Sequence, residues 1–122
     1  ITTHNLSNVE SIANVIYMAG EVRTANPLSR FLLHPLHWGF AAPSADHLRL
    51  REWASCLDDD LNRFIQIMDI ETKKKNPSEI ADWKDLITSA TILHPGRASE
   101  LGIVHQVEAA TIPTESIRWW VL

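Results

Sequence analysis

The sequence predicts a single α/β domain in which parallel strands are joined by crossover helices. Short apolar segments bounded by turn residues, which are typical of strands, alternate along the chain with segments of helical periodicity. This alternation favours a parallel sheet covered by helices. The chain has 122 residues, of which 45% are hydrophobic, and this is enough for one modest core. We therefore expect one domain over residues 1–122.

The first part of the chain predicts strands on both sides of a short helix. Residues 1–5 are expected to form the end of a strand. Ser7 and Asn8 offer caps for an apolar helix that runs to Gly20, a residue type common just after helices. Two short strands are then predicted around an Asn-Pro turn, at residues 22–25 and 30–34.

A long amphipathic helix is predicted over residues 44–72. Its apolar side chains recur at spacings of three and four residues, at Leu50, Trp53, Leu57, Leu61, Phe64 and Met68. Three further apolar residues lie outside this stripe, at Leu48, Ile65 and Ile67. The helix is also longer than a small sheet can cover. We therefore expect it to pack between subunits of a homo-oligomer.

The remaining elements have recognisable start and end signals. Residues 76–79 combine an Asn cap, Pro at the first helical position and Glu at the third, which predicts a helix there. A strand at 90–93, a helix from Pro95 to Gly102 and a strand at 103–107 follow. Residues 108–122 form a C-terminal tail, whose last four residues are expected to pack against protein, because they are far too few to span a membrane.

Composition excludes several classes of function. The net charge is −4 and the only basic run, at 73–75, is short, so we expect no nucleic-acid partner. No stretch is suited to a signal peptide or a membrane span, which predicts a cytoplasmic protein. The single cysteine, Cys56, fits a reducing compartment. Because Cys56 falls inside a predicted helix, we do not expect it to be catalytic.

Ser11 and His34 are the candidate catalytic pair. The serine opens the apolar helix, where backbone N–H groups favour negative charge and an oxyanion is best stabilised. The histidine ends a strand, and Pro35 biases it to extended geometry, which suits a fixed general base. Taken alone, such a serine is usually a helix cap and such a histidine is usually structural.

Three segments together resemble the Clp protease proteolytic subunit family of serine peptidases. They are residues 11–20, residues 25–34 with the sequence Ala-Asn-Pro-Leu-Ser-Arg-Phe-Leu-Leu-His, and residues 98–104 with the sequence Ala-Ser-Glu-Leu-Gly-Ile-Val. The resemblance extends from about His4 to Val107. It implies a ClpP/crotonase-like layered fold, with the long helix 44–72 as the family's handle helix.

The resemblance implies hydrolysis of peptide bonds through an acyl-enzyme on Ser11, with His34 as base and the backbone N–H of Ile12 as an oxyanion donor. The family's acid aligns near Leu86, so Asp85 is the predicted third member, with Asp82 next and Thr88 as a polar substitute. Peptides or unfolded proteins would be the substrates, and an ATP-dependent unfoldase is a further implied partner. No cofactor is expected.

The chain departs from the family in its glycines. The family has an upstream βαβ portion with a glycine pair that lines the substrate groove, whereas none of the four glycines here precedes Ser11. The N-terminal portion of the fold is thus expected to be missing. Since the chain also begins at Ile1 without an initiator methionine, we expect a fragment or a processed product.

Two other functions remain open from the sequence. One is a non-catalytic subunit that keeps the fold and the handle helix as an assembly scaffold. The other is an acyl-CoA hydratase or isomerase of the related crotonase fold, which needs no serine nucleophile. A zinc site at His34 and His37 is less favoured, because Pro35 prevents the helix that would place both on one face, and no carboxylate motif accompanies them.

Overall fold

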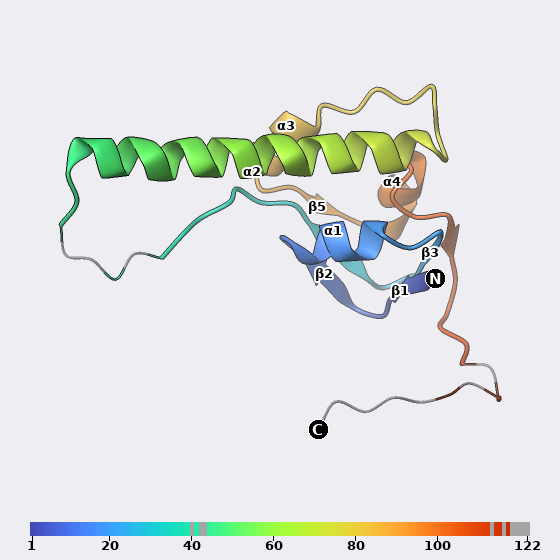
Figure 1. Cartoon of the computed structure of the whole chain (residues 1–122). Coiled ribbons are helices and arrows are strands. Elements are labelled where there is room, and N and C mark those ends of the chain that lie inside the picture. The colour runs from blue at the N-terminus through green and yellow to red at the C-terminus, as the bar shows by residue number, and fades with distance from the viewer. Residues whose placement is uncertain (40, 42–43, 113, 116, 118–122) are drawn as a thin grey trace.

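The computed structural model describes residues 1–39, 41, 44–112, 114–115 and 117 of the chain. Over these residues the architecture is mixed α/β, with two three-stranded sheets (Figure 1). The elements in chain order are β1 (Thr2–Asn5), β2 (Asn8–Glu10), α1 (Ala13–Met18), β3 (Val22–Ala25), β4 (Arg30–Leu32), α2 (His47–Lys73), α3 (Trp83–Thr88), β5 (Ile92–Leu93), α4 (Pro95–Glu100) and β6 (Gln106–Val107).

Two stretches of chain contribute a strand to each of the two sheets. The first stretch supplies β1 and then β2, and the second supplies β3 and then β4. One sheet has the order β1-β3-β6 and is parallel throughout, whereas the other has the order β2-β4-β5, with β2 and β4 parallel and β5 antiparallel. Buried Asn5 bridges the bend between them. Its Nδ2 donates to the Arg30 carbonyl oxygen at 2.9 Å, and its Oδ1 accepts from the Ser7 backbone N–H at 3.1 Å. The predicted parallel pairing is therefore confirmed for β1-β3-β6 and for β2-β4, but the strands form two sheets and β5 is antiparallel.

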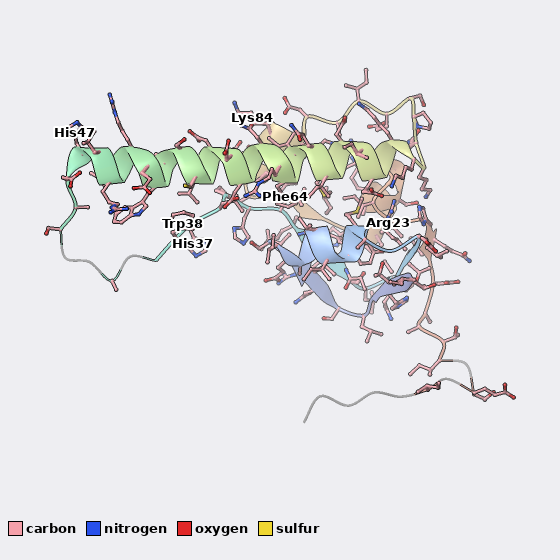
Figure 2. All side chains as sticks on the ribbon, viewed as in Figure 1. Arg23, His37, Trp38, His47, Phe64 and Lys84 are labelled. Carbon is pink, nitrogen blue, oxygen red and sulfur yellow. The ribbon has the colours of Figure 1, made fainter. Side chains whose placement is uncertain are left out.

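Helix α2 lies across the body formed by α1 and the sheets, and its first half extends beyond them (Figure 1). Asp46 caps the helix, because its side chain accepts from the Arg49 backbone N–H at 3.0 Å. Phe64 and Met68 are buried in the second half, and Figure 2 shows Phe64 on the side of α2 that faces the sheets. The core therefore lies under the second half of this helix. Its fully or nearly buried members are Tyr17, Met18, Ala25, Phe31, Leu33, Phe64, Met68, Trp83, Ile87, Leu93, Ala98, Leu101, Ile103 and Val104.

Arg23, on β3, is buried to 2% exposure and binds the C-terminal ends of three helices. Its Nη1 donates to the carbonyl oxygen of Gly20 after α1, and its Nη2 donates to that of Glu71 in the last turn of α2. Nη2 and Nε donate to Gly102 and Ile103 after α4, at 3.1 and 2.8 Å. The guanidinium thus compensates carbonyl groups at the negative ends of these helices. Figure 2 shows Arg23 below the end of α2.

Two titratable groups lie near this guanidinium. Burial lowers the pKa of His105, and the charges of Arg23 and Lys75 lower it further. His105 Nδ1 accepts from the Arg23 backbone N–H at 3.0 Å, which fits a neutral ring. Burial also lowers the pKa of Lys75, whose ammonium donates to the carbonyl oxygens of Val104 and His105. Both residues therefore anchor the chain after α4 and do not present reactive groups.

Gly102 ends α4 in a left-handed conformation, with φ at +85°. Its N–H donates to the Ser99 carbonyl oxygen, and the N–H of Ile103 donates to that of Ala98 at 2.8 Å, which is a Schellman motif. A Cβ atom at this position would lie 2.6 Å from the backbone oxygen of Thr72. The close approach of α4 to the end of α2 therefore requires glycine.

The strand predicted at 22–25 is present as β3, and the long helix and the helix from Pro95 to near Gly102 are also confirmed. The strands predicted at 30–34, 90–93 and 103–107 are shorter, and appear as β4, β5 and β6. Two further predictions were wrong. Residues 8–10 form a strand, so Asn8 does not cap a helix. The helix predicted from residue 77 begins instead at Trp83, because the Asn76 side chain donates to the Glu100 carbonyl oxygen and Asp82 supplies the cap.

The final residues of the predicted tail, Trp119 to Leu122, lie outside the described residues. Within the part of the chain that is described, no helix has the length and apolar character needed to cross a bilayer.

Candidate functional site

Ser11 occupies a sharp turn between a strand and a helix. It follows β2 directly and lies two residues before α1, with φ at 55°, a left-handed conformation that non-glycine residues rarely adopt. The prediction that Ser11 lies in the first helical turn is therefore wrong in detail. The observed strand-turn-helix conformation is the one that exposes a nucleophilic serine in hydrolases built on parallel sheets.

Buried Asn14 holds this turn in place. Its Nδ2 donates to the Ser11 carbonyl oxygen at 2.9 Å and to the Leu32 carbonyl oxygen on β4 at 3.0 Å. The Ser11 backbone N–H also donates to Leu32, at 3.0 Å. Strained backbone conformations cost about 1 to 3 kcal/mol and persist only where the surroundings fix them, and they concentrate at functional sites. Here these three hydrogen bonds hold the left-handed conformation of Ser11.

His34 lies at the same edge of the sheet as Ser11. Strands β2 and β4 are parallel, with Glu10 opposite Leu32, so both chains leave the sheet in the same direction. Leu33 is fully buried, and its N–H donates to the Thr91 carbonyl oxygen at 2.9 Å, which anchors the residue before the histidine. The structure therefore places the turn at Ser11 next to Leu32, the last residue of β4, and His34 follows two residues later.

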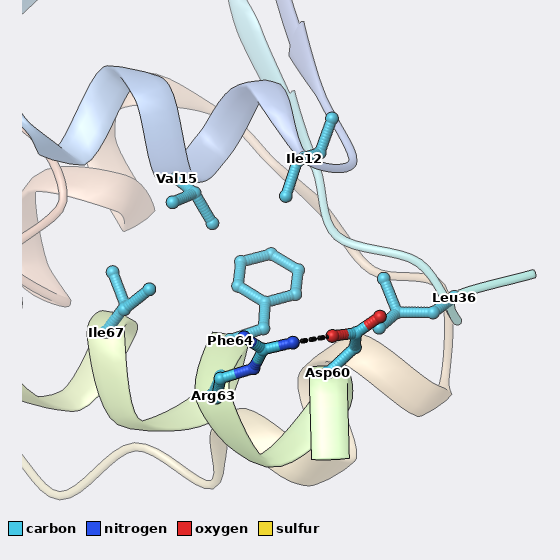
Figure 3. Close-up of a pocket in the computed structure, with 7 residues that line it drawn as sticks. All are labelled: Ile12, Val15, Leu36, Asp60, Arg63, Phe64 and Ile67. Carbon is cyan, nitrogen blue, oxygen red and sulfur yellow. Dashed lines mark hydrogen bonds and ion pairs between the residues drawn. The ribbon is translucent and has the colours of Figure 1, made fainter. Parts of the chain in front are cut away.

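An apolar pocket of about 320 Å³ lies between α1, α2 and the segment that follows His34 (Figure 3). Its wall contains Ile12, which follows Ser11, and Leu36, which comes two residues after His34. The remaining lining comes from α1 and α2, at Val15, Asp60, Arg63, Phe64 and Ile67. The Asp60 and Arg63 side chains form an ion pair across one side of it. An apolar group of a ligand would fit here, against Ile12, the residue after the candidate nucleophile.

Two groups at the turn have no partner among the described residues. The Ser11 hydroxyl makes no hydrogen bond there, and the backbone N–H of Ile12 donates to no acceptor. An unengaged N–H beside a nucleophile is what oxyanion stabilisation requires. The geometry is therefore compatible with the role predicted for Ile12.

The predicted acid is not joined to His34. Within the described residues no ion pair or hydrogen bond links a carboxylate to that ring, and its Nδ1 lies 2.8 Å from the Pro35 carbonyl oxygen. Asp85 is exposed in the first turn of α3, where its Oδ1 accepts from the Ser89 hydroxyl at 3.3 Å. Asp82 caps α3, and Thr88 donates to the Lys84 carbonyl oxygen. All three candidates on this helix thus serve local contacts.

Comparison with known proteins leaves the family open. The chain matches no protein-family model and none of the curated proteins. What can be said of its function therefore comes from the geometry of the site itself.

The sequence analysis did not identify Asn14 or the pocket. A polar residue inside an otherwise apolar helical run, three residues after the candidate serine, was the available signal for Asn14. Phe64 was predicted as part of the apolar stripe and Ile67 as a contact to another subunit, because apolar periodicity does not distinguish a pocket wall from a packed surface. His34 and His37 have ring centroids 6.1 Å apart, and no group of three metal-binding side chains occurs among the described residues.

Proposed function

We propose that the chain is a serine peptidase with a ClpP/crotonase-like fold that acts in the cytoplasm on peptides or unfolded proteins. The observation that carries this proposal is the left-handed conformation of Ser11 at a strand-helix turn, beside the parallel strand that leads to His34. Ala90 also has a left-handed backbone, with φ at 54°, so the conformation of Ser11 supports the proposal through its position between a strand and a helix. The unengaged N–H of Ile12 and the adjacent apolar pocket support the same function.

The proposed reaction is acyl transfer to water. His34 Nε2 accepts the Ser11 hydroxyl proton as Oγ attacks the substrate carbonyl carbon, and the developing oxyanion accepts from the Ile12 N–H. The tetrahedral intermediate collapses as His34 returns the proton to the leaving amine, which departs and leaves an ester on Ser11. Water, deprotonated by the same histidine, then hydrolyses the ester.

A fluorophosphonate probe tests this function, because it labels a serine only where a base activates it. We expect labelling of the wild-type chain and none of Ser11→Ala, while His34→Ala should label about 10² to 10⁴ times more slowly. Ser7→Ala is the matched control, since Ser7 is an exposed serine on the same stretch of chain. The bound probe should be located at Ser11 by mass spectrometry.

Two outcomes would contradict the peptidase. Equal labelling of the wild type and Ser11→Ala would show that Ser11 is not the nucleophile. A folded wild-type chain that is not labelled would favour the scaffold subunit or, if it binds acyl-CoA, the crotonase-type enzyme.

We also propose that the chain forms a homo-oligomer through the first half of α2, which projects past the sheets. Leu48 and Leu50 are 64% and 54% exposed there. The expectation that Ile65 and Ile67 are left for a neighbouring subunit is wrong, because both pack against the core of the same chain. Burial of such side chains contributes about 1.5 to 3 kcal/mol each. The double variant Leu48→Glu, Leu50→Glu is expected to weaken association at least about a hundredfold in sedimentation experiments.

The matched control for association is Leu28→Glu, because Leu28 is 96% exposed on the turn between β3 and β4, away from α2. This variant should associate as the wild type does. A wild-type chain that remains monomeric at micromolar concentration would overturn the proposed interface.

A further inference from the structure

We propose that the carbonyl group of Pro35, and not a carboxylate, orients the imidazole of His34. The His34 Nδ1 atom lies 2.8 Å from the Pro35 carbonyl oxygen, a normal hydrogen-bond distance. A carbonyl oxygen can only accept, so Nδ1 carries the proton of the neutral ring and Nε2 keeps its lone pair. This inference rests on the proposed function, in which Nε2 is the base.

The protonation state that results is the one a base needs. In a serine-histidine-aspartate triad the aspartate binds the Nδ1 proton, which holds the correct tautomer and stabilises the imidazolium that forms. A neutral carbonyl supplies the first effect, because it accepts the same hydrogen bond. The carbonyl lacks the negative charge that provides most of the stabilisation of the imidazolium. The site would therefore work as a Ser11-His34 dyad with a fixed tautomer.

Proline is suited to this position. Its ring holds φ near −65°, so the peptide group that carries the carbonyl has fewer orientations available than in other residues. It also restricts His34 to extended backbone conformations. Leu33, the residue before, is fully buried and hydrogen-bonded to Thr91. The backbone on both sides of the imidazole is therefore constrained before a substrate binds.

The carboxylates on α3 are used elsewhere. Asp82 Oδ1 accepts from the Asp85 backbone N–H at 2.9 Å, and Asp85 Oδ1 accepts from the Ser89 hydroxyl. The His34 ring also lies near that of His37, with ring centroids 6.1 Å apart. His37 is not acidic and cannot replace the aspartate of a triad.

The tautomer can be measured directly by long-range ¹H–¹⁵N correlation spectra of the chain labelled with ¹⁵N-histidine. At about pH 8, above the ordinary histidine pKa of about 6.5, the protonated and unprotonated nitrogens have well-separated shifts. We expect His34 to carry its proton on Nδ1 in the wild type, in Asp82→Asn and in Asp85→Asn. His34→Gln and His37→Gln assign the signals.

Pro35→Ala keeps the carbonyl but frees its orientation, so we expect a mixed tautomer population in that variant. A proton on Nε2 in the wild type would overturn the inference. A change of tautomer in Asp85→Asn would also overturn it, and would assign the orienting role to Asp85. Because the spectra do not depend on activity, a chain with the Nδ1 proton that is not labelled by the fluorophosphonate would contradict the peptidase alone.

Discussion

Replacing Arg23 with alanine is expected to unfold the domain. The substitution removes the guanidinium donors to the carbonyl oxygens of Gly20, Glu71, Gly102 and Ile103, which lie at the ends of three helices. Each buried acceptor left without a partner costs about 1 to 3 kcal/mol. The sum is comparable with the whole stability of a small domain, about 5 to 15 kcal/mol. Urea denaturation followed by circular dichroism would measure the loss.

Arg30→Ala is the matched control for this prediction. Arg30 also lies on a central strand, but its ion pair with Glu10 is exposed, so its loss should cost about 0 to 1 kcal/mol. An Arg23→Ala variant as stable as Arg30→Ala would show that water replaces the guanidinium and that the helix ends do not depend on it.

Gly102→Ala and Gly96→Ala are expected to change stability in opposite directions. At Gly102 the left-handed backbone alone costs an L-residue roughly 1 to 2 kcal/mol, and the new Cβ would meet the backbone oxygen of Thr72 at 2.6 Å. At Gly96, inside α4, nothing lies within 4 Å of the added atom, and alanine favours helix by up to about 1 kcal/mol. Melting temperatures of the two variants would be compared with that of the wild type.

A Gly102→Ala variant as stable as the wild type would show that the end of α4 does not require glycine. The same experiment would also show whether α4 and the end of α2 can separate without loss of the fold. A stabilised Gly96→Ala variant would confirm that the method resolves effects of this size.

The elements that could be predicted are those in which one local signal dominates. Apolar periodicity over many turns predicted α2, and a β-branched stretch before an Asn-Pro turn predicted β3. Residues 76–79 misled because Asn76 uses its side chain to bind the Glu100 carbonyl oxygen, 24 residues away. A partner that distant is not visible in a local pattern. The antiparallel direction of β5 likewise depends on the path of the chain and not on its residues.

The sequence identified candidate residues of the site but not the structure around them. It did not predict the strand before Ser11, and the parallel pairing of that strand, β2, with β4 is what brings Ser11 next to Leu32. Nothing local to Ser11 predicts its positive φ, which depends on the buried amide of Asn14. Asp85 was assigned by counting along the chain, but α3 begins later than expected, and the aspartate lies in its exposed first turn.

The amide of Asn14 has a consequence for motion within the site. Because its Nδ2 binds both the Ser11 carbonyl and the Leu32 carbonyl, the serine turn and the strand leading to His34 are connected by a group that is 1% exposed. Thermal displacement of one would carry the other with it. The relative position of the Ser11 turn and the end of β4 is therefore fixed by this amide as the chain folds.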